Sequence, residues 1–307
     1  MKNTILEMRD FFLELRNAYK KKENVMAKAR ELSSRTENSS FATLVAYDLQ
    51  SGNYVARAKE NPVYREKWGN QLGKLIEPWI ETGDLILEVG VGEATTLAYV
   101  YQYLKNKKVQ FCGFDISWSR IDVGKEFLRE MAANADLFVA DLFNIPFADN
   151  SIDIVYTAHS LEPNGGRELE ALSECLRIAR KAVILVEPAF ELGTEEARER
   201  MIANGYVRGL RDTAEKLGAN VADYRLLEVF GNQLNPSAVL TLTKKFDTMK
   251  SRSKDDFWVC PITSFPLEKK RDLFFSSDAG LAYPILRDIP LLRAEHAIIA
   301  SRLTKSI

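Results

Sequence analysis

A glycine-rich turn joins a hydrophobic run to a helical pattern. The run Leu85–Val89 contains Glu88, and Gly90 and Gly92 come directly after it. Glycines let a ligand approach the backbone closely, and the first turn of a helix offers free N–H groups as hydrogen-bond donors. A strand, a glycine turn and a helix start in this order predict a nucleotide-binding site.

Two aspartates end the next two hydrophobic runs. Asp115 stands 25 positions after Gly90, and a carboxylate at the end of this second run can accept hydrogen bonds from both hydroxyls of a ribose. Asp115 could also cap the helix that begins near Ser117, although Ser117 itself could do so, and the two roles are compatible. Asp141 ends the third run. Both aspartates are therefore candidate nucleotide-binding residues.

The loop at 157–166 follows the fourth hydrophobic run and holds the candidate catalytic residues. His159 is one of only two histidines, and the ordinary pKa of a histidine suits a general base at neutral pH. Glu162 could orient His159 or cap the helix that begins near Arg167. The alternative for His159 is that it only supports the cofactor pocket. Both roles of His159 stay open at this point.

Five strand-type apolar runs alternate with helical patterns, which is typical of a parallel sheet with crossover helices. The runs are 85–89, 109–114, 137–140, 152–157 and 182–186. A charged helical stretch over 194–217 then precedes two β-rich runs, at 225–229 and 238–243. No long crossover separates these last two runs, so they are expected to pair as antiparallel strands.

The glycine turn and the strand pattern resemble those of class I S-adenosylmethionine-dependent methyltransferases. The pattern acidic-x-Gly-x-Gly-x-(Gly/Ala) of that family is met by Glu88, Gly90, Gly92 and Ala94. A dinucleotide fingerprint would instead require a small residue at the position of Thr95. The spacing therefore favours S-adenosylmethionine over NAD.

The residue pattern of 141–156 also resembles a pattern that is typical of class I methyltransferases. The core is similar to that of the ubiquinone/menaquinone methyltransferases. The resemblance covers about residues 68–245. It implies an α/β, Rossmann-like seven-stranded sheet with helices on both faces, with S-adenosylmethionine as cofactor and S-adenosylhomocysteine as product. It further implies that the Asp141 carboxylate takes the adenine amino group, that Leu142 lends a backbone N–H, and that Ile116 packs on the adenine.

Two motifs that are absent from the sequence limit the class of the methyl acceptor. Methyl transfer from a sulfonium is a direct displacement, so the protein chiefly aligns the acceptor and removes a proton where necessary. The Asn/Asp-Pro-Pro-Tyr/Phe tetrad of enzymes that methylate base or glutamine amino groups is absent after the fourth strand. No evident carboxylate cluster indicates a magnesium site. We therefore expect an oxygen or nitrogen nucleophile of a small molecule, such as a metabolite, a sugar or a natural product.

The last fifty residues form a separate pattern, with Tyr283-Pro-Ile followed by Ile289-Pro-Leu-Leu. This pattern is similar to that of the small zinc-ribbon-like proteins that activate tRNA and protein methyltransferases. Of the cysteine positions of that family only Cys260 remains, with Thr263 and Ser276 near two others. A zinc site needs four ligands, so we expect no metal, and a module too small to be comfortably stable alone should dock on the sheet in cis.

This module leaves the function partly open. It could recruit a macromolecule such as tRNA or a protein as the methyl acceptor, or it could be a fused stabiliser of an enzyme with a small acceptor. A third alternative is a non-catalytic subunit that binds S-adenosylmethionine without turnover. We expect three parts: a helical extension or lid at 1–67, the methyltransferase domain at 68–250 and the activator-like module at 254–307.

The N-terminal part predicts an amphipathic helix that runs to about Ala29. Its apolar stripe consists of Ile5, Met8, Phe12, Leu15 and Tyr19. We expect the stripe to dock on its own domain, because the pattern is too short for a coiled coil, and a homo-oligomer through this helix stays open as the alternative. The aromatic residues that follow could form a lid that excludes water from the sulfonium. They are Tyr47, Tyr54, Tyr64 and Trp68.

Composition limits the compartment and the partners. The 42 Lys and Arg residues nearly cancel the 43 Asp and Glu residues, so no overall field favours nucleic acid or an anionic membrane. Cys112, Cys175 and Cys260 form no CxxC pair, which indicates a reducing, cytoplasmic environment. No apolar run approaches the roughly 20 residues that span a bilayer, and the N-terminus does not read as a signal peptide.

Overall fold

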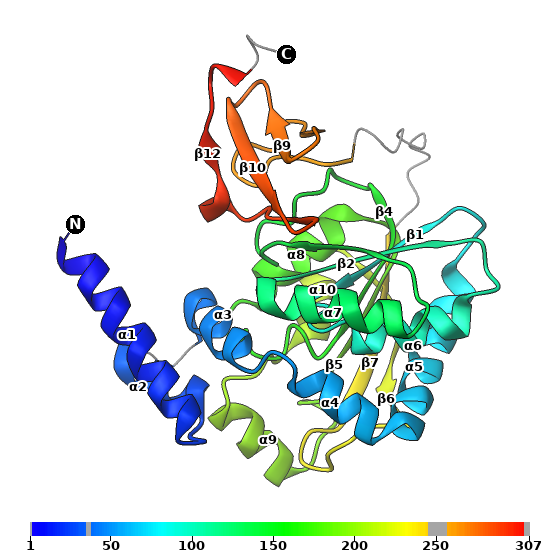
Figure 1. Cartoon of the computed structure of the whole chain (residues 1–307). Coiled ribbons are helices and arrows are strands. Elements are labelled where there is room, and N and C mark those ends of the chain that lie inside the picture. The colour runs from blue at the N-terminus through cyan, green and yellow to red at the C-terminus, as the bar shows by residue number, and fades with distance from the viewer. Residues whose placement is uncertain (1, 35–37, 245–256, 304–307) are drawn as a thin grey trace.

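The computed structural model describes residues 2–34, 38–244 and 257–303, and its centre is a seven-stranded sheet (Figure 1). The strand order is β3-β2-β1-β4-β5-β7-β6, in which β1 to β5 run parallel and β7 is antiparallel to both β5 and β6. The predicted Rossmann-like methyltransferase fold is thereby confirmed. The strands are β1 (Leu85–Val89), β2 (Gln110–Asp115), β3 (Asp136–Val139), β4 (Ile152–Ala158), β5 (Ala179–Pro188), β6 (Asn220–Leu226) and β7 (Ser237–Thr243).

Helices cover both faces of this sheet, which is why its central strands are apolar on both sides. Ile86 of β1 points into a core with α5, α6 and α7, whereas its neighbour Leu87 points into a core with α8 and α10. The helices of the domain are α5 (Pro62–Ile76), α6 (Thr95–Leu104), α7 (Trp118–Glu130), α8 (Glu168–Ile178), α9 (Glu195–Ala203) and α10 (Leu210–Lys216), with a 3-10 turn η1 (Glu77–Trp79) after α5.

The predicted helix that runs to about Ala29 is wrong as a single element. The chain forms α1 (Lys2–Lys20) and α2 (Val25–Ser33), and the Asn24 side chain between them caps α2 by accepting the Ala27 N–H at 3.0 Å. The polar run after Tyr19 has no apolar side chain with which to continue the stripe.

The stripe of α1 is only partly buried. Leu15 is buried against α2 and α3 (Ser40–Leu49), while Met8 and Phe12 are 50% and 40% exposed. The side chain of Ile5 lies outside the described part of the chain. Figure 1 shows α1 reaching away from the sheet, with its packing partners α2 and α3 on one side only. The short helix α4 (Asn53–Glu60) then leads into α5.

The first of the two late β-rich runs lies earlier than predicted. The sequence placed a strand at 225–229, but β6 is Asn220–Leu226 and pairs with β7 from Asn220 opposite Thr243 to Leu226 opposite Ala238. Backbone pairing with the buried β7 thus outweighs the local apolar character of the later residues. The charged stretch before it forms two helices, which are separated where Gly205 and Gly209 take positive φ angles of 68° and 63°.

A small second sheet follows residue 257, in the order β11-β10-β9-β8 with β12 paired to β10. Leu292 donates its N–H to the Val139 carbonyl of β3 at 2.8 Å, and Leu291 pairs with Val139 in parallel. The predicted docking in cis is therefore confirmed. The elements are β8 (Glu268–Lys269), β9 (Leu273–Ser276), β10 (Leu281–Leu286), β11 (Ile289–Pro290), a 3-10 turn η3 (Ala294–His296) and β12 (Ile298–Ile299).

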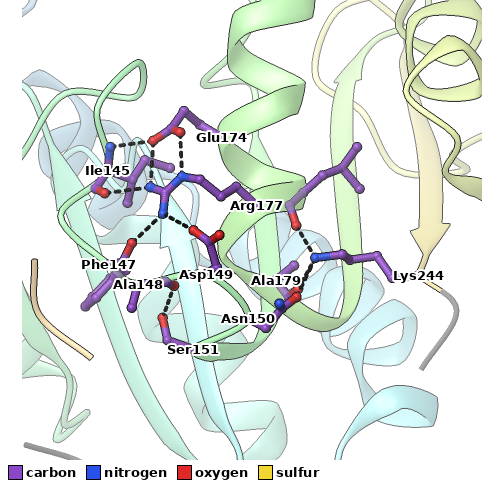
Figure 2. Close-up of polar contacts among 11 residues, drawn as sticks. Ile145, Phe147, Ala148, Asp149, Asn150, Ser151, Glu174, Arg177, Ala179 and Lys244 are labelled. Carbon is purple, nitrogen blue, oxygen red and sulfur yellow. Dashed lines mark hydrogen bonds and ion pairs between the residues drawn. The ribbon is translucent and has the colours of Figure 1, made fainter. Parts of the chain in front are cut away.

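An arginine fixes the loop that receives this module (Figure 2). Arg177 of α8 donates to the carbonyls of Phe147 and Ile145 at 2.6 and 2.9 Å, and its guanidinium also pairs with Glu174. The same loop accepts the Val259 N–H at the Pro146 carbonyl, at 3.1 Å. The loop is thus held by α8 on one side and by the C-terminal module on the other.

The expected division into three parts stays a proposal. Helix α5 crosses residues 67 and 68, where the first boundary was expected, and the second boundary falls within 245–256, outside the described residues. Within the described part of the chain, no helix combines the length and the apolar character that crossing a bilayer requires.

Candidate active site

A cavity of about 420 Å³ opens where β1, β2 and β4 end. Its size lies in the range of small-molecule sites, roughly 300–1,000 Å³. In the described structure it is lined by all the predicted site residues except Gly92, whose neighbour Gly90 does line it. The predicted residues in the lining are Glu88, Gly90, Asp115, Ile116, Asp141, Leu142, His159 and Glu162.

The two glycines of the turn leave no room for a side chain. Gly90 has a φ of +67°, and a Cβ built on it would lie 2.3 Å from the Cβ of Ser160. Gly92 has a φ of +57°, and its Cβ would lie 2.3 Å from Nη2 of Arg120. Left-handed φ angles and this crowding together explain why both positions hold glycine.

Asp115 connects the glycine turn to the start of α7. Its Oδ2 accepts the Gly92 N–H at 3.0 Å and its Oδ1 accepts the Ser117 N–H at 2.9 Å. Ser117 is the helix cap, because its hydroxyl accepts the Arg120 N–H at 3.2 Å. Oδ2 also lies 3.5 Å from Nη1 of Arg120, whereas Oδ1 keeps a further lone pair with which it could accept a ribose hydroxyl.

Glu88 is buried beneath the turn. Only 2% of the residue is exposed, and its Oε2 accepts the hydroxyl hydrogen of Tyr156 at 2.6 Å. Burial raises the pKa of Glu88 to about 8, because a carboxylate loses its hydration there. The side chain therefore holds a proton at neutral pH and adds a neutral hydrogen-bonding group to the cavity.

His159 is held at both ring nitrogens. Its Nδ1 lies 2.5 Å from Oε2 of Glu162, and its Nε2 lies 2.7 Å from Oγ of Ser237, the first residue of β7. Burial lowers the pKa of His159, but the Glu162 carboxylate outweighs this effect, so that the pKa lies above its usual value. Burial likewise opposes ionisation of Glu162, while His159 holds the pKa of Glu162 below its usual value.

Glu187 at the end of β5 supports the loop that carries His159. Its carboxylate accepts three backbone N–H groups, those of Ser160 and Leu161 at 3.1 Å and that of Glu162 at 3.0 Å. Burial raises the pKa of Glu187 to about 7 against these donors. Glu187 does not itself line the cavity in the described structure, so it acts on the loop from behind.

The N-terminal helices cover the cavity and are anchored to the cofactor loops. The aromatic residues suggested as a lid, Tyr47, Tyr54, Tyr64 and Trp68, all line the cavity. The guanidinium of Arg120 lies 5.0 Å from the ring centre of Tyr47 and 4.7 Å from that of Tyr54, in cation–π contact.

Glu93 of the glycine turn adds a second anchor. Its carboxylate accepts the N–H groups of Gly52 and Val55 at 2.9 and 2.7 Å, at the beginning of α4. Sequence reasoning missed Glu93, Arg120 and Ser237. Position gives a signal for the first two, since Glu93 lies inside the glycine motif and Arg120 lies one turn into the helix after Asp115.

Four buried polar side-chain atoms of residues that line the cavity have no hydrogen-bond partner within the described part of the chain. They are Oγ1 of Thr43, Nε of Arg120, Oγ of Ser160 and Oδ1 of Asn235. Buried polar groups are nearly always satisfied in folded proteins, so these atoms indicate a polar ligand. The carboxylates, the glycine turn and these atoms together fit the nucleoside and amino-acid parts of S-adenosylmethionine.

Residues 86–182 match the family model of a methyltransferase domain. A search of curated proteins finds no match. Among solved structures, magnesium protoporphyrin IX methyltransferase from Synechocystis with bound S-adenosylhomocysteine is 15% identical, over 61% of this chain and 86% of that chain, with a TM-score of 0.48.

Two further structures are similar at the same TM-score of 0.48. The cyclase SpnF is 16% identical over 58% of this chain and 81% of that chain. A chain of the complex between a Haloferax volcanii methyltransferase activator and a putative methyltransferase is 13% identical, over 64% of this chain and 96% of that chain. The family match, which covers the glycine turn and the sheet strands β1 to β4, carries the assignment. Residues 86–182 are accordingly identified as a methyltransferase domain.

Proposed function

We propose that the protein moves the methyl group of S-adenosylmethionine to an oxygen or nitrogen nucleophile of a small molecule. The observation that carries this proposal is the cover of the cavity. Arg120 and Glu93 fix the N-terminal helices over the site, which leaves a cavity of small-molecule size. Such a cover also keeps water from the sulfonium.

The cofactor would lie against the ends of β1, β2 and β3. We assign the ribose hydroxyls to Asp115, the adenine amino group to Asp141, the adenine N1 side to the Leu142 N–H, and the adenine face to Ile116. Gly90 and Gly92 keep the turn open to the ligand. When bound, S-adenosylmethionine supplies a methyl group on a positively charged sulfur, ready for direct displacement.

His159 is assigned as the base and Glu162 as the residue that orients it. The short contact between Nδ1 and the Glu162 carboxylate fixes the ring and favours its protonated form. Trp68 packs near the ring, with the two ring centres 6.0 Å apart. The alternative, in which His159 only supports the pocket, predicts that its removal changes stability but leaves the pH dependence of turnover unchanged.

The C-terminal module is assigned as a fused, zinc-free relative of the activator proteins, and the core as ubiquinone/menaquinone-methyltransferase-like. The contacts of the C-terminal module with β3 and with the loop at 145–148 support its role as a stabiliser of the domain. A homo-oligomer through α1 stays part of the proposal because Met8 and Phe12 are exposed. Three free, buried cysteines support a cytoplasmic location, and the balanced charge supports a partner other than nucleic acid.

The experiment that tests this proposal follows a labelled methyl group. Purified protein is incubated with methyl-tritiated S-adenosylmethionine and a cell extract, and label is counted in the acid-soluble and acid-precipitable fractions. The proposal expects label in the soluble, low-molecular-mass fraction, and no such label with the Asp115→Ala variant. Label in tRNA or protein instead would favour the recruiting module and overturn the small-molecule assignment. No transfer to any fraction would favour a non-catalytic subunit.

A further inference from the structure

Ser237 lines the cavity beside His159 and contacts Nε2 of its ring. It is the first residue of β7, it lies opposite Pro188 of β5, and only 1% of the residue is exposed, yet it lines the cavity. His159 reaches it from the loop after β4 because its backbone has a left-handed φ of 57°, while its N–H bonds to the Val186 carbonyl at 2.8 Å. The ring is therefore turned toward β7.

The partners of the ring define where its protons lie. An ionised carboxylate can only accept hydrogen bonds, so Glu162 takes the hydrogen on Nδ1 of His159. In the neutral ring Nε2 is then the acceptor, and the hydroxyl of Ser237 donates to it across 2.7 Å. The Ser237 hydroxyl thus occupies the lone pair of Nε2, so a proton that leaves the cavity for this nitrogen passes through Oγ of Ser237.

We propose that Ser237 passes the proton of the methyl acceptor to His159, and that the acceptor is therefore an alcohol or a phenol. This inference rests on the proposed methyl transfer. A serine hydroxyl has one hydrogen to donate and lone pairs left to accept another, which is what a relay requires. A neutral amine has a free electron pair and needs no proton removed before the displacement, whereas a hydroxyl gains its nucleophilic strength by losing one.

The step balances without any further reactant. The acceptor oxygen forms a bond to the methyl carbon as the bond between that carbon and the sulfur breaks, and the sulfur keeps the electron pair. The acceptor proton moves to Oγ of Ser237 while the serine proton moves to Nε2 of His159. The imidazolium later releases its proton to solvent.

The charges around His159 favour this direction. Glu162 lies on the same loop and Glu187 approaches from β5, and both carboxylates favour the protonated ring. Tyr206, between α9 and α10, bonds to Glu162 and Asn235 donates to it, while Trp68 of α5 adds an uncharged face. The turnover of an alcohol should therefore rise with pH as His159 loses its proton, at a pH above the ordinary histidine value.

The first experiment reads the protons directly in the protein with bound S-adenosylhomocysteine. The chain has two histidines, so nitrogen NMR of histidine-labelled protein, with a His296→Gln variant for assignment, isolates the signals of His159. We expect neutral His159 to carry its hydrogen on Nδ1, and Ser237→Ala to shift the Nε2 resonance toward that of a nitrogen without a donor. A hydrogen on Nε2 of the neutral ring, or no shift in the variant, would overturn the relay.

The second experiment identifies the acceptor atom. The protein receives carbon-13-methyl S-adenosylmethionine and a low-molecular-mass extract, and the product carbon is read by NMR, where methoxy and N-methyl carbons separate. A methoxy product supports the inference, an N-methyl product overturns it while the proposed methyl transfer stands, and no product contradicts the proposed function itself.

Variants complete the test. Ser237→Ala should lower kcat by about 10²–10⁴-fold, the usual contribution of proton transfer, with a smaller change in KM. Ser237→Thr, which keeps the hydroxyl, should restore most of the rate. Ser276→Ala, at an equally buried serine in the C-terminal module, is the matched control. Equal loss in the alanine and threonine variants would show a packing role and overturn the relay.

Discussion

Glu88 provides the sharpest prediction, because its substitution by glutamine should make the protein more stable at alkaline pH. The side chain is buried and accepts the Tyr156 hydroxyl hydrogen, and glutamine keeps both the shape and an acceptor oxygen. Burial raises the pKa of Glu88 from 4.5 to about 8, and a glutamine in its place cannot ionise. In the folded natural protein, by contrast, the Glu88 carboxyl must either keep its proton or become a buried charge as the pH rises.

The magnitude follows from the pKa difference. One pKa unit corresponds to about 1.36 kcal/mol, so a rise from 4.5 to about 8 corresponds to about 5 kcal/mol. Because the folded-state pKa lies above the unfolded-state value, the contribution of Glu88 to stability is fully present below pH 4.5 and is lost as pH rises through about 8. Relative to the natural protein, Glu88→Gln should gain about 4 kcal/mol more at pH 9 than at pH 5.

Urea denaturation of the ligand-free protein at a series of pH values measures this difference. Glu66→Gln, at an exposed glutamate of α5, is the matched control and should run parallel to the natural protein. Parallel curves for Glu88→Gln as well would show that Glu88 is ionised throughout, and the reasoning from burial would be refuted.

Three other predictions concern the module, the turn and the metal. Trp258→Ala removes a ring 4.5 Å from that of Phe147, so the free energy of unfolding should fall by about 3–5 kcal/mol in urea; a loss below about 1 kcal/mol would mean that the module is not part of the core. Gly90→Ala should abolish heat on titration with S-adenosylhomocysteine, because its Cβ meets Ser160, and full binding would contradict the geometry. Metal analysis should find no zinc, and a chelator should leave the unfolding midpoint unchanged; one zinc per chain, lost together with stability, would disprove the prediction made from Cys260.

The sheet was predictable because its signals are local. Strands buried on both faces read as continuous apolar runs, so β1 and β4 begin at the residues that the sequence indicated. The candidate cofactor-binding residues lie in short motifs that begin or end these strands. The only sign of the break after Lys20 in the sequence is a polar run. An amphipathic helix can continue through such a run or end at it, so the run does not decide between one helix and two. The position of β6 depends on pairing with β7, which no local pattern contains.

The contacts that complete the site could not be predicted from the sequence, because they also join residues that are far apart in it. His159 and Ser237 are 78 positions apart, and Glu93 meets Gly52 across 41 positions. A single serine at the start of a strand has no local signature of a role. Such pairs become visible only when the strand order brings β4 and β7 to either side of β5.

Calorimetric titration with S-adenosylhomocysteine tests the central claim most directly, namely that the cavity at the ends of β1, β2 and β3 holds the cofactor. The natural protein should bind one molecule per chain with micromolar affinity. Asp115→Ala should weaken binding by about 1.5–3 kcal/mol, the range for hydrogen bonds to a charged group, whereas Asp272→Ala at an exposed position should not. No heat with the natural protein, or equal affinity in Asp115→Ala, would contradict the account.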